Sequence, residues 1–312
     1  RTVVLLYTAI MIVSGAAVAF APNHLVFMIG RALIGVAVGG FWSLSTAILA
    51  RVVSSADLPK AIAMLQGGTA LATVLAAPLG SFLGGLVGWR VAFFLVVPVG
   101  IVGLLWQLAV LPRMPAQSSV NVGHMLGLLR QRLFAVGIVA TVLAFMGFYA
   151  LSTYLRPYLE NVAGFDVNGL SLALFGLGLA GLAGNLVVGL LVRTHLKAAL
   201  VGLPTIMGIL AVMMVAFVEV PWSVAVLVVL WGLVATPIPV AWNTWMARVI
   251  PNDLEAGGGL QVALIQFAIT FGAAAGGLLF DAAGWWSPFA LAAALLAGSA
   301  LVAARSVPMG RG

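Results

Sequence analysis

Long apolar runs separated by short polar connections follow one another along almost the whole chain. Each is about 20 residues or longer, enough for a helix to cross a bilayer. There are ten, at residues 2–21, 24–48, 61–87, 91–111, 133–155, 168–192, 198–218, 222–246, 257–280 and 285–304. They lack the alternation of barrel strands, so they predict membrane-spanning α-helices. Pro237 and Pro239 lie inside one run and predict a break in its backbone hydrogen bonding.

Composition leads to the same class of protein. Hydrophobic residues make up 63% of the 312 residues and charged residues only 7%, whereas soluble domains carry about 25% charged residues. The sequence therefore predicts an all-α integral membrane protein with the lipid bilayer around it.

Basic residues are concentrated on one side of the predicted spans. That side holds Arg1, Arg51, Lys60, Arg113, Arg130, Arg132, Arg193, Lys197, Arg248, Arg305 and Arg311, whereas Arg31, Arg90 and Arg156 lie elsewhere. Basic loops stay in the cytoplasm, so we expect a multi-pass inner (plasma) membrane protein whose central loop and C-terminus are cytoplasmic. The net charge of +7 is scattered singly between apolar runs, which favours topology over a nucleic-acid partner.

An internal repeat divides the chain. Residues 61–89 resemble 256–284: both have Leu-Gln early, a core of small residues and a Gly-Trp exit. A parallel repeat of this kind is typical of a transporter built from two pseudo-symmetric halves. The two copies are about 196 residues apart, so Lys197, just before the third helix of the second half, corresponds to Arg1. We therefore expect the chain to begin at the third helix of a six-helix half, with two helices missing.

The predicted organisation has three parts. Residues 1–111 form a truncated N-terminal half with helices 3–6, and residues 112–132, the one sizeable polar stretch, form a cytoplasmic central loop. Residues 133–312 form a six-helix C-terminal half. Glycines four residues apart, at Gly35/Gly39, Gly80/Gly84 and Gly272/Gly276, predict close helix packing.

Two segments carry a family resemblance. Residues 30–35, GRALIG, resemble a fourth-helix motif in which an arginine precedes small residues. Residues 77–80, APLG, followed by Gly88-Trp89-Arg90, resemble a fifth-helix antiporter motif, although Ala77 stands in place of a glycine and Ser81-Phe82 in place of paired glycines. The chain thus resembles the drug:proton antiporter branch of the major facilitator superfamily, and within it bacterial purine ribonucleoside efflux pumps.

The resemblance implies a fold and an activity. The fold would be the major facilitator fold with ten of twelve transmembrane helices (helices 3–12) present. The activity would be proton-coupled efflux (antiport) of purine ribonucleosides by alternating access, with a nucleoside-like small molecule and protons as ligands. Sugar or multidrug efflux by an antiporter of the same branch is the first alternative, and a passive facilitator is the second. We expect a monomer without a cofactor.

Arg31 is the most informative single residue. An arginine at the centre of a membrane helix costs roughly 2.5–3.5 kcal/mol on insertion scales, so it usually faces a partner or a water-filled cavity. Gly35, Val38, Trp42 and Ser45 share its helix face at about 100° per residue. Coupling or substrate contact is one interpretation; a structural ion pair, or snorkelling to the interface, is the other.

Other polar residues in the spans are candidate ligand contacts. The predicted substrate-binding or coupling set is Arg31, Trp42, Ser45, Gln66, Tyr149, Asn243 and Gln266. Packing remains the alternative for Trp42, and helix-to-helix hydrogen bonding for the amides. For Arg156 we favour a loop-anchoring ion pair with Glu160 or Asp166.

The sequence gives no reason to expect an enzyme. No nucleophile–base pair or carboxylate cluster lies at membrane depth, and His24, His124 and His195 are too dispersed to share one metal. No catalytic or metal-binding residue is therefore predicted. In the branch that the chain resembles, the proton-coupling acid often lies in the first helix, and that residue would be outside this chain.

Overall fold

The computed structural model describes residues 1–54, 61, 64–65, 68–69, 71–72, 76, 80, 83, 87–112 and 122–306, and within these ranges the chain is helical with no strand. It divides into two compact units, Arg1–Ser119 and Val120–Gly312. We call them the N-terminal unit and the C-terminal unit and describe each separately.

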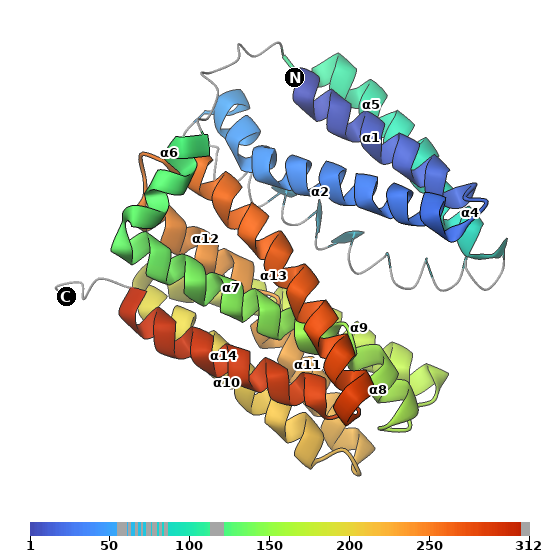
Figure 1. Ribbon diagram of the computed structural model, residues 1–312, viewed down its shortest axis with the longest axis vertical. Helices are drawn as coiled ribbons and strands as arrows, with labels where there is room; N and C mark the ends of the chain where they lie inside the picture. The colour runs from blue at the N-terminus through green and yellow to red at the C-terminus, as the bar shows by residue number, and fades with distance from the viewer. Residues whose placement is uncertain are drawn as a thin grey trace. The chain divides into compact units, whose positions relative to one another are not determined.

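The N-terminal unit has four described helices: α1 (Thr2–Ala19), α2 (His24–Val52), α4 (Trp89–Phe94) and α5 (Val96–Val110). Helix α1 packs against both α2 and α5 (Figure 1). The Ser14 hydroxyl donates to the Gly30 carbonyl over 2.6 Å, and the Thr8 hydroxyl donates to Oε1 of Gln107 over 2.8 Å. Buried polar groups on α1 are therefore paired with its neighbours, as a water-free interior requires.

The C-terminal unit contains the remaining helices. They are α6 (Val122–Gly127), the 3₁₀ turn η1 (Leu128–Arg130), α7 (Arg132–Ser152), α8 (Leu155–Asn161), α9 (Val167–Thr194), α10 (Leu196–Ala216), α11 (Pro221–Ala235), α12 (Ile238–Val249), α13 (Leu254–Ala283) and α14 (Ser287–Ser306). Helix α7 packs against α13 and α14, α10 against α14, and α9 against α11 (Figure 1).

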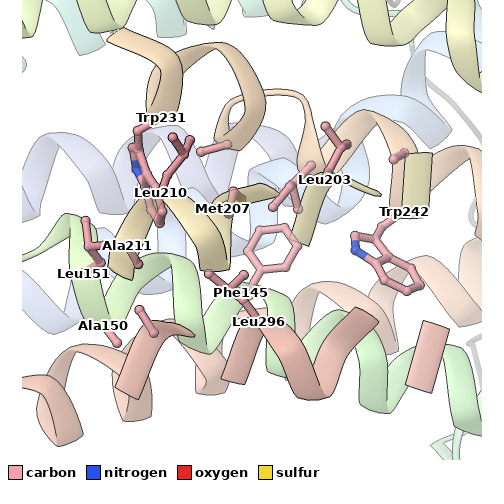
Figure 2. Close-up of a cluster of buried hydrophobic side chains, with 14 of the residues drawn as sticks. Phe145, Ala150, Leu151, Leu203, Met207, Leu210, Ala211, Trp231, Trp242 and Leu296 are labelled. Atoms are coloured by element: carbon pink, nitrogen blue, oxygen red, sulfur yellow. The ribbon is translucent and has the colours of Figure 1, made fainter. Parts of the chain in front are cut away.

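The core of this unit is apolar and tightly closed. Phe145 of α7, Met207 of α10 and Leu296 of α14 meet at its centre, with Trp231 and Trp242 on either side (Figure 2). At the start of the unit, Nε2 of His124 lies 2.8 Å from Oδ1 of Asp253 and ties α6 to the beginning of α13.

The predicted spans agree well with the described helices. Nine candidate membrane spans occur in the described part of the chain: Thr2–Ala19, His24–Trp42, Trp89–Val110, Arg132–Asn161, Val167–Val192, Leu196–Ala216, Pro221–Val249, Ala256–Ala283 and Ser287–Arg305. The tenth predicted run, at 61–87, lies mostly outside the described residues. The predicted break is confirmed, because α11 ends at Ala235 and α12 begins at Ile238.

Glycines bring pairs of helices in the C-terminal unit into backbone contact. A Cβ atom on Gly184 of α9 would overlap the carbonyl of Leu233, and one on Gly232 of α11 would overlap the carbonyl of Leu177. Gly272 lies equally close to the Met146 carbonyl of α7, which confirms its predicted packing role. Such contacts matter in lipid, where helices associate through close packing rather than through exclusion of water.

Of the other glycines predicted to pack closely, one does so within the described part of the chain and two do not. Gly276 packs against the Ala150 carbonyl, as expected, but Gly35 meets no described atom within 4 Å that would obstruct a side chain. Among the described residues, Gly35 is therefore not a packing position. Gly80 likewise has no described neighbour within 4 Å, and its predicted partner Gly84 lies outside the described residues.

Gly184→Ala should destabilise the C-terminal unit, because the new methyl group meets a backbone oxygen that cannot rotate away. Overpacking of this kind costs about 1–3 kcal/mol, so the apparent melting temperature in detergent should fall. Gly189→Ala, on the same helix, is the control: nothing lies within 4 Å of that position, and alanine is favoured over glycine in a helix by about 1 kcal/mol. Equal melting temperatures for the two variants would contradict the close α9–α11 contact.

Candidate functional site

A pocket of about 250 Å³ lies within the C-terminal unit, where the end of α7 and the start of α8 face α9 and α11. Its lining combines aromatic, aliphatic and hydroxyl side chains with one cation. The lining residues are Phe148, Ser152, Leu155, Arg156, Leu174, Leu177, Trp231, Gly232, Ala235 and Thr236.

Two aromatic residues, Phe148 and Trp231, line this pocket. The rings of Phe148 and Trp231 are stacked, with centroids 6.1 Å apart and planes inclined by 20°. Trp231 is 1% exposed, and its indole Nε1 donates to the Ser152 hydroxyl over 3.3 Å. The tryptophan is thus held in place by both packing and a hydrogen bond, as a buried indole usually is.

The helix break supplies the polar part of the pocket. Pro237 and Pro239 have no N–H group, so the carbonyls of Leu233 and Ala235 lack their usual partners four residues on. Thr236 lies at the break and lines the pocket, and its hydroxyl has no hydrogen-bond partner among the described residues. Irregular backbone at membrane depth is tolerated where it lines a cavity, which is the situation of α11 and α12.

Arg156 at the pocket rim is already paired. Its Nε donates to Oε1 of Glu160 over 2.8 Å, one helical turn away. Asp166, the other predicted partner, instead caps α9 by accepting from the amide of Gly169 over 2.9 Å. The predicted ion pair with Glu160 is therefore confirmed, but it lies within α8 and does not anchor a loop.

Arg31 and Trp42 are both exposed and share one face of α2, three turns apart. The guanidinium carbon of Arg31 is 5.8 Å from the centroid of the Phe93 ring, a distance at which a cation interacts with the ring face. The one carboxylate in residues 1–119 is Asp57, which lies outside the described residues. Among the described residues of its own unit, Arg31 thus has an aromatic contact and no carboxylate.

The remaining predicted residues are dispersed. Ser45 is 7% exposed and its hydroxyl donates to the Trp42 carbonyl over 2.9 Å, so it does not share the exposed face of α2. Tyr149 packs its ring edge against Phe148, with centroids 4.8 Å apart. Asn243 is exposed on α12 and Gln266 is half-buried on α13. Gln66 lies outside the described residues.

None of the six described residues of the predicted set lines the pocket, although the Tyr149 ring contacts that of Phe148. The sequence reasoning missed Phe148 and Trp231, because an aromatic residue inside an apolar run gives no sign of whether it faces a cavity or the core. The usable signal was the proline pair after Thr236, which marked the break that opens the pocket.

Two buried amides have unsatisfied atoms. Oδ1 of Asn185 on α9 and Nε2 of Gln261 on α13 have no hydrogen-bond partner in the described part of the chain. Gln261 is 2% exposed, whereas Gln266, which the sequence favoured, is half-buried. Leaving a buried donor unpaired costs about 1–3 kcal/mol, so the Gln261 side chain is expected to lower the stability of the folded protein.

Gln261→Leu should therefore stabilise the protein, since it replaces an unpaired buried amide with an apolar side chain of similar size. We expect a higher apparent melting temperature in detergent, consistent with removal of about 1 kcal/mol or more of unfavourable burial. Gln266→Leu, on the same helix but half-buried, should change it little. A lower melting temperature for Gln261→Leu would mean that its amide is satisfied in the folded protein.

The described helices and the broken span define a polytopic membrane protein. The sequence profile of the Major Facilitator Superfamily matches residues 1–259, and the chain belongs to this family. Its fold resembles crystal structures of the transporter FucP, one of them in the outward conformation, with a TM-score of 0.72, 15% identity and coverage of 98% of this chain and 83% of that one. At this identity the likeness shows the fold alone.

Two curated relatives are much more similar in sequence. The transcription regulatory protein OpdE of Pseudomonas aeruginosa is 46% identical over 300 residues, which cover 95% of this chain and 75% of that protein. The purine ribonucleoside efflux pump NepI of Salmonella paratyphi B is 37% identical over 307 residues, which cover 98% of this chain and 77% of the pump. The chain is a Major Facilitator Superfamily transporter, and its relatives point to no enzyme family.

Proposed function

We propose that the protein exports purine ribonucleosides across the inner membrane in exchange for protons, by alternating access. The observation that carries this proposal is the stacked Phe148–Trp231 pair in the pocket lining, together with the hydroxyls of Ser152 and Thr236. A flat ring with polar edges suits such a lining, and the similarity to NepI over 98% of the chain supports the same substrate class.

The pocket is sized for part of a nucleoside. Its volume of about 250 Å³ lies just below the range of roughly 300–1,000 Å³ that is usual for complete ligand sites. Stacking of a base on an aromatic side chain contributes about 1–3 kcal/mol in nucleic-acid binding. In this proposal the base packs against the half-buried ring of Phe148 and the ribose lies toward the hydroxyls of Ser152 and Thr236.

Trp42, Gln66, Asn243 and Gln266 remain proposed contacts for the polar edges and the flat face of the ligand, together with Ser45 and Tyr149. The orientation that follows from basic loops places residues 112–132 and the C-terminus in the cytoplasm. Export then moves the ligand away from the side that carries these segments.

Arg31 is the proposed coupling residue. Its charge lies in an apolar helix, on an exposed face, and no carboxylate occurs among the described residues of its own unit. An uncompensated charge of this kind favours an ionised acid that approaches it and disfavours that acid's protonated form. Proton release and uptake by such an acid would then follow the approach and departure of Arg31.

The pocket is tested by removing one hydroxyl. Thr236→Val keeps the shape of the side chain but loses a hydrogen bond with a net value of about 1 kcal/mol, so the KM for inosine should rise about fivefold at unchanged maximal rate. Thr153→Val is the control, because that hydroxyl is exposed and donates to the Tyr149 carbonyl of its own helix. Uptake into inverted vesicles carrying the longest natural form of the protein measures both. An unchanged KM for Thr236→Val would remove Thr236 from the site.

Arg31→Ala should abolish proton-driven inosine uptake into the same vesicles while the protein still inserts in the membrane, because the charge on which coupling depends is gone. Arg31→Lys keeps the charge but not the planar guanidinium, and should retain part of the activity. Immunoblots of membrane fractions measure insertion. Normal uptake by Arg31→Ala would rule out the coupling role.

Substrate competition separates the proposal from its alternatives. Guanosine should compete with inosine, whereas a pentose or a hydrophobic drug that competes better would favour a sugar or multidrug exporter. Uptake that persists without a pH gradient would favour a passive facilitator.

The similarity to OpdE favours a second candidate, an influence on transcription. A membrane-spanning transporter would exert such an influence indirectly, through the ligand that it moves. If that is so, transcript changes that depend on the protein should disappear with Arg31→Ala; their persistence would indicate a role independent of transport.

A further inference from the structure

A second and larger hollow lies on the C-terminal unit, between α10 and α14. This groove has a volume of about 640 Å³ and is lined by Thr205, Gly208, Ile209, Val212, Met213, Ala293, Ala294, Ala297, Ala300 and Leu301. Nothing in the proposed transport mechanism uses it. Its floor consists of glycine and alanine, and its edges are exposed aliphatic side chains: Ile209 is 53% exposed and Leu301 70%.

The chemistry of the groove suits contact with lipid. Its one polar side chain is Thr205, and that hydroxyl is satisfied inside its own helix by donation to the Val201 carbonyl over 2.8 Å. A threonine bonded back in this way exposes no unpaired donor to an apolar surrounding. The groove therefore presents an apolar, concave surface of a shape that an acyl chain can fill.

Two cations stand at one end of the groove. Gly208 of α10 packs against Ala293 of α14, and this contact fixes the register of the two antiparallel helices. Lys197 lies about 16 Å below Gly208 along α10, and Arg305 about 18 Å below Ala293 along α14, at 1.5 Å per residue. The two basic side chains are thus at nearly the same level.

Both side chains are also on suitable faces. At about 100° per residue, Lys197 lies within roughly 20° of Gly208 around α10, and Arg305 within roughly 40° of Leu301 around α14. Both are exposed, and neither forms an ion pair with an acidic residue that the structure describes. A pair of cations at the end of an apolar groove between membrane helices is complementary to an anionic lipid.

We propose that this groove binds an anionic phospholipid of the bilayer, with an acyl chain along α10 and α14 and the phosphate headgroup between Lys197 and Arg305. The orientation inferred from basic loops places this end at the cytoplasmic leaflet, where anionic lipids produce a negative surface potential. The proposal does not rest on the identity of the transported ligand. It adds a lipid site on a helix pair that the transport pocket does not include.

Native mass spectrometry of the purified full-length protein in detergent tests the proposal, with phosphatidylglycerol and phosphatidylcholine of identical acyl chains as probes. Phosphatidylglycerol should be retained in preference to phosphatidylcholine. The double variant Lys197→Gln/Arg305→Gln should lose this preference, with a loss of about 25-fold in affinity, or about fivefold for each cation. Arg130→Gln/Arg132→Gln is the matched control, because those cations are exposed in the same unit but belong to η1 and α7.

A groove-filling variant tests the acyl-chain part separately. Ala297 is exposed in the groove, so Ala297→Phe should block both lipids and leave the melting temperature largely unchanged. Equal retention of the two lipids by the wild type, or full phosphatidylglycerol binding by Lys197→Gln/Arg305→Gln, would overturn the headgroup site. Wild-type binding by Ala297→Phe, or a dimer that Ala297→Phe dissociates, would show that a lipid chain does not occupy the groove.

Discussion

The backbone contact between α9 and α11 is the constraint on which the C-terminal unit depends. Gly184 and Gly232 each face a carbonyl oxygen of the other helix, at Leu233 and Leu177, with no room for a methyl group. In lipid, such proximity replaces the hydrophobic effect as the source of helix association. It also fixes where α11 lies when its helix breaks at Pro237, and so determines where the pocket opens.

The break and the close contact work together. A proline-interrupted span has carbonyls without partners, which are costly in hydrocarbon. Because α9 approaches so closely through Gly181 and Gly184, the Leu233 carbonyl is covered by helix backbone and does not face lipid. The close approach of α9 thus keeps one of the two carbonyls freed by the prolines, that of Leu233, away from the bilayer.

Features set by neighbouring residues could be predicted from the sequence, whereas contacts between residues far apart along the chain could not. The spans and the break at Pro237 are local properties, set by hydropathy and by the missing proline N–H, and both were predicted. The stacking of Phe148 on Trp231 joins residues 83 positions apart, and no local pattern specifies it. The placement of Arg31 against Phe93 was missed for the same reason, since helical periodicity defines a face but not what that face meets.

Hydroxyl groups in the spans show which polar residues remain available to a ligand. Thr141 and Thr244 donate back to carbonyls of their own helices, so their presence costs little in the membrane and leaves no donor free. Thr236 differs from these two threonines, because it lies at the helix break and its hydroxyl has no described partner. Gln261 also has an unpaired donor, and that donor is buried. The two cases differ in cost, because a buried donor without a partner reduces stability, whereas the exposed hydroxyl of Thr236 costs nothing and stays available to a ligand.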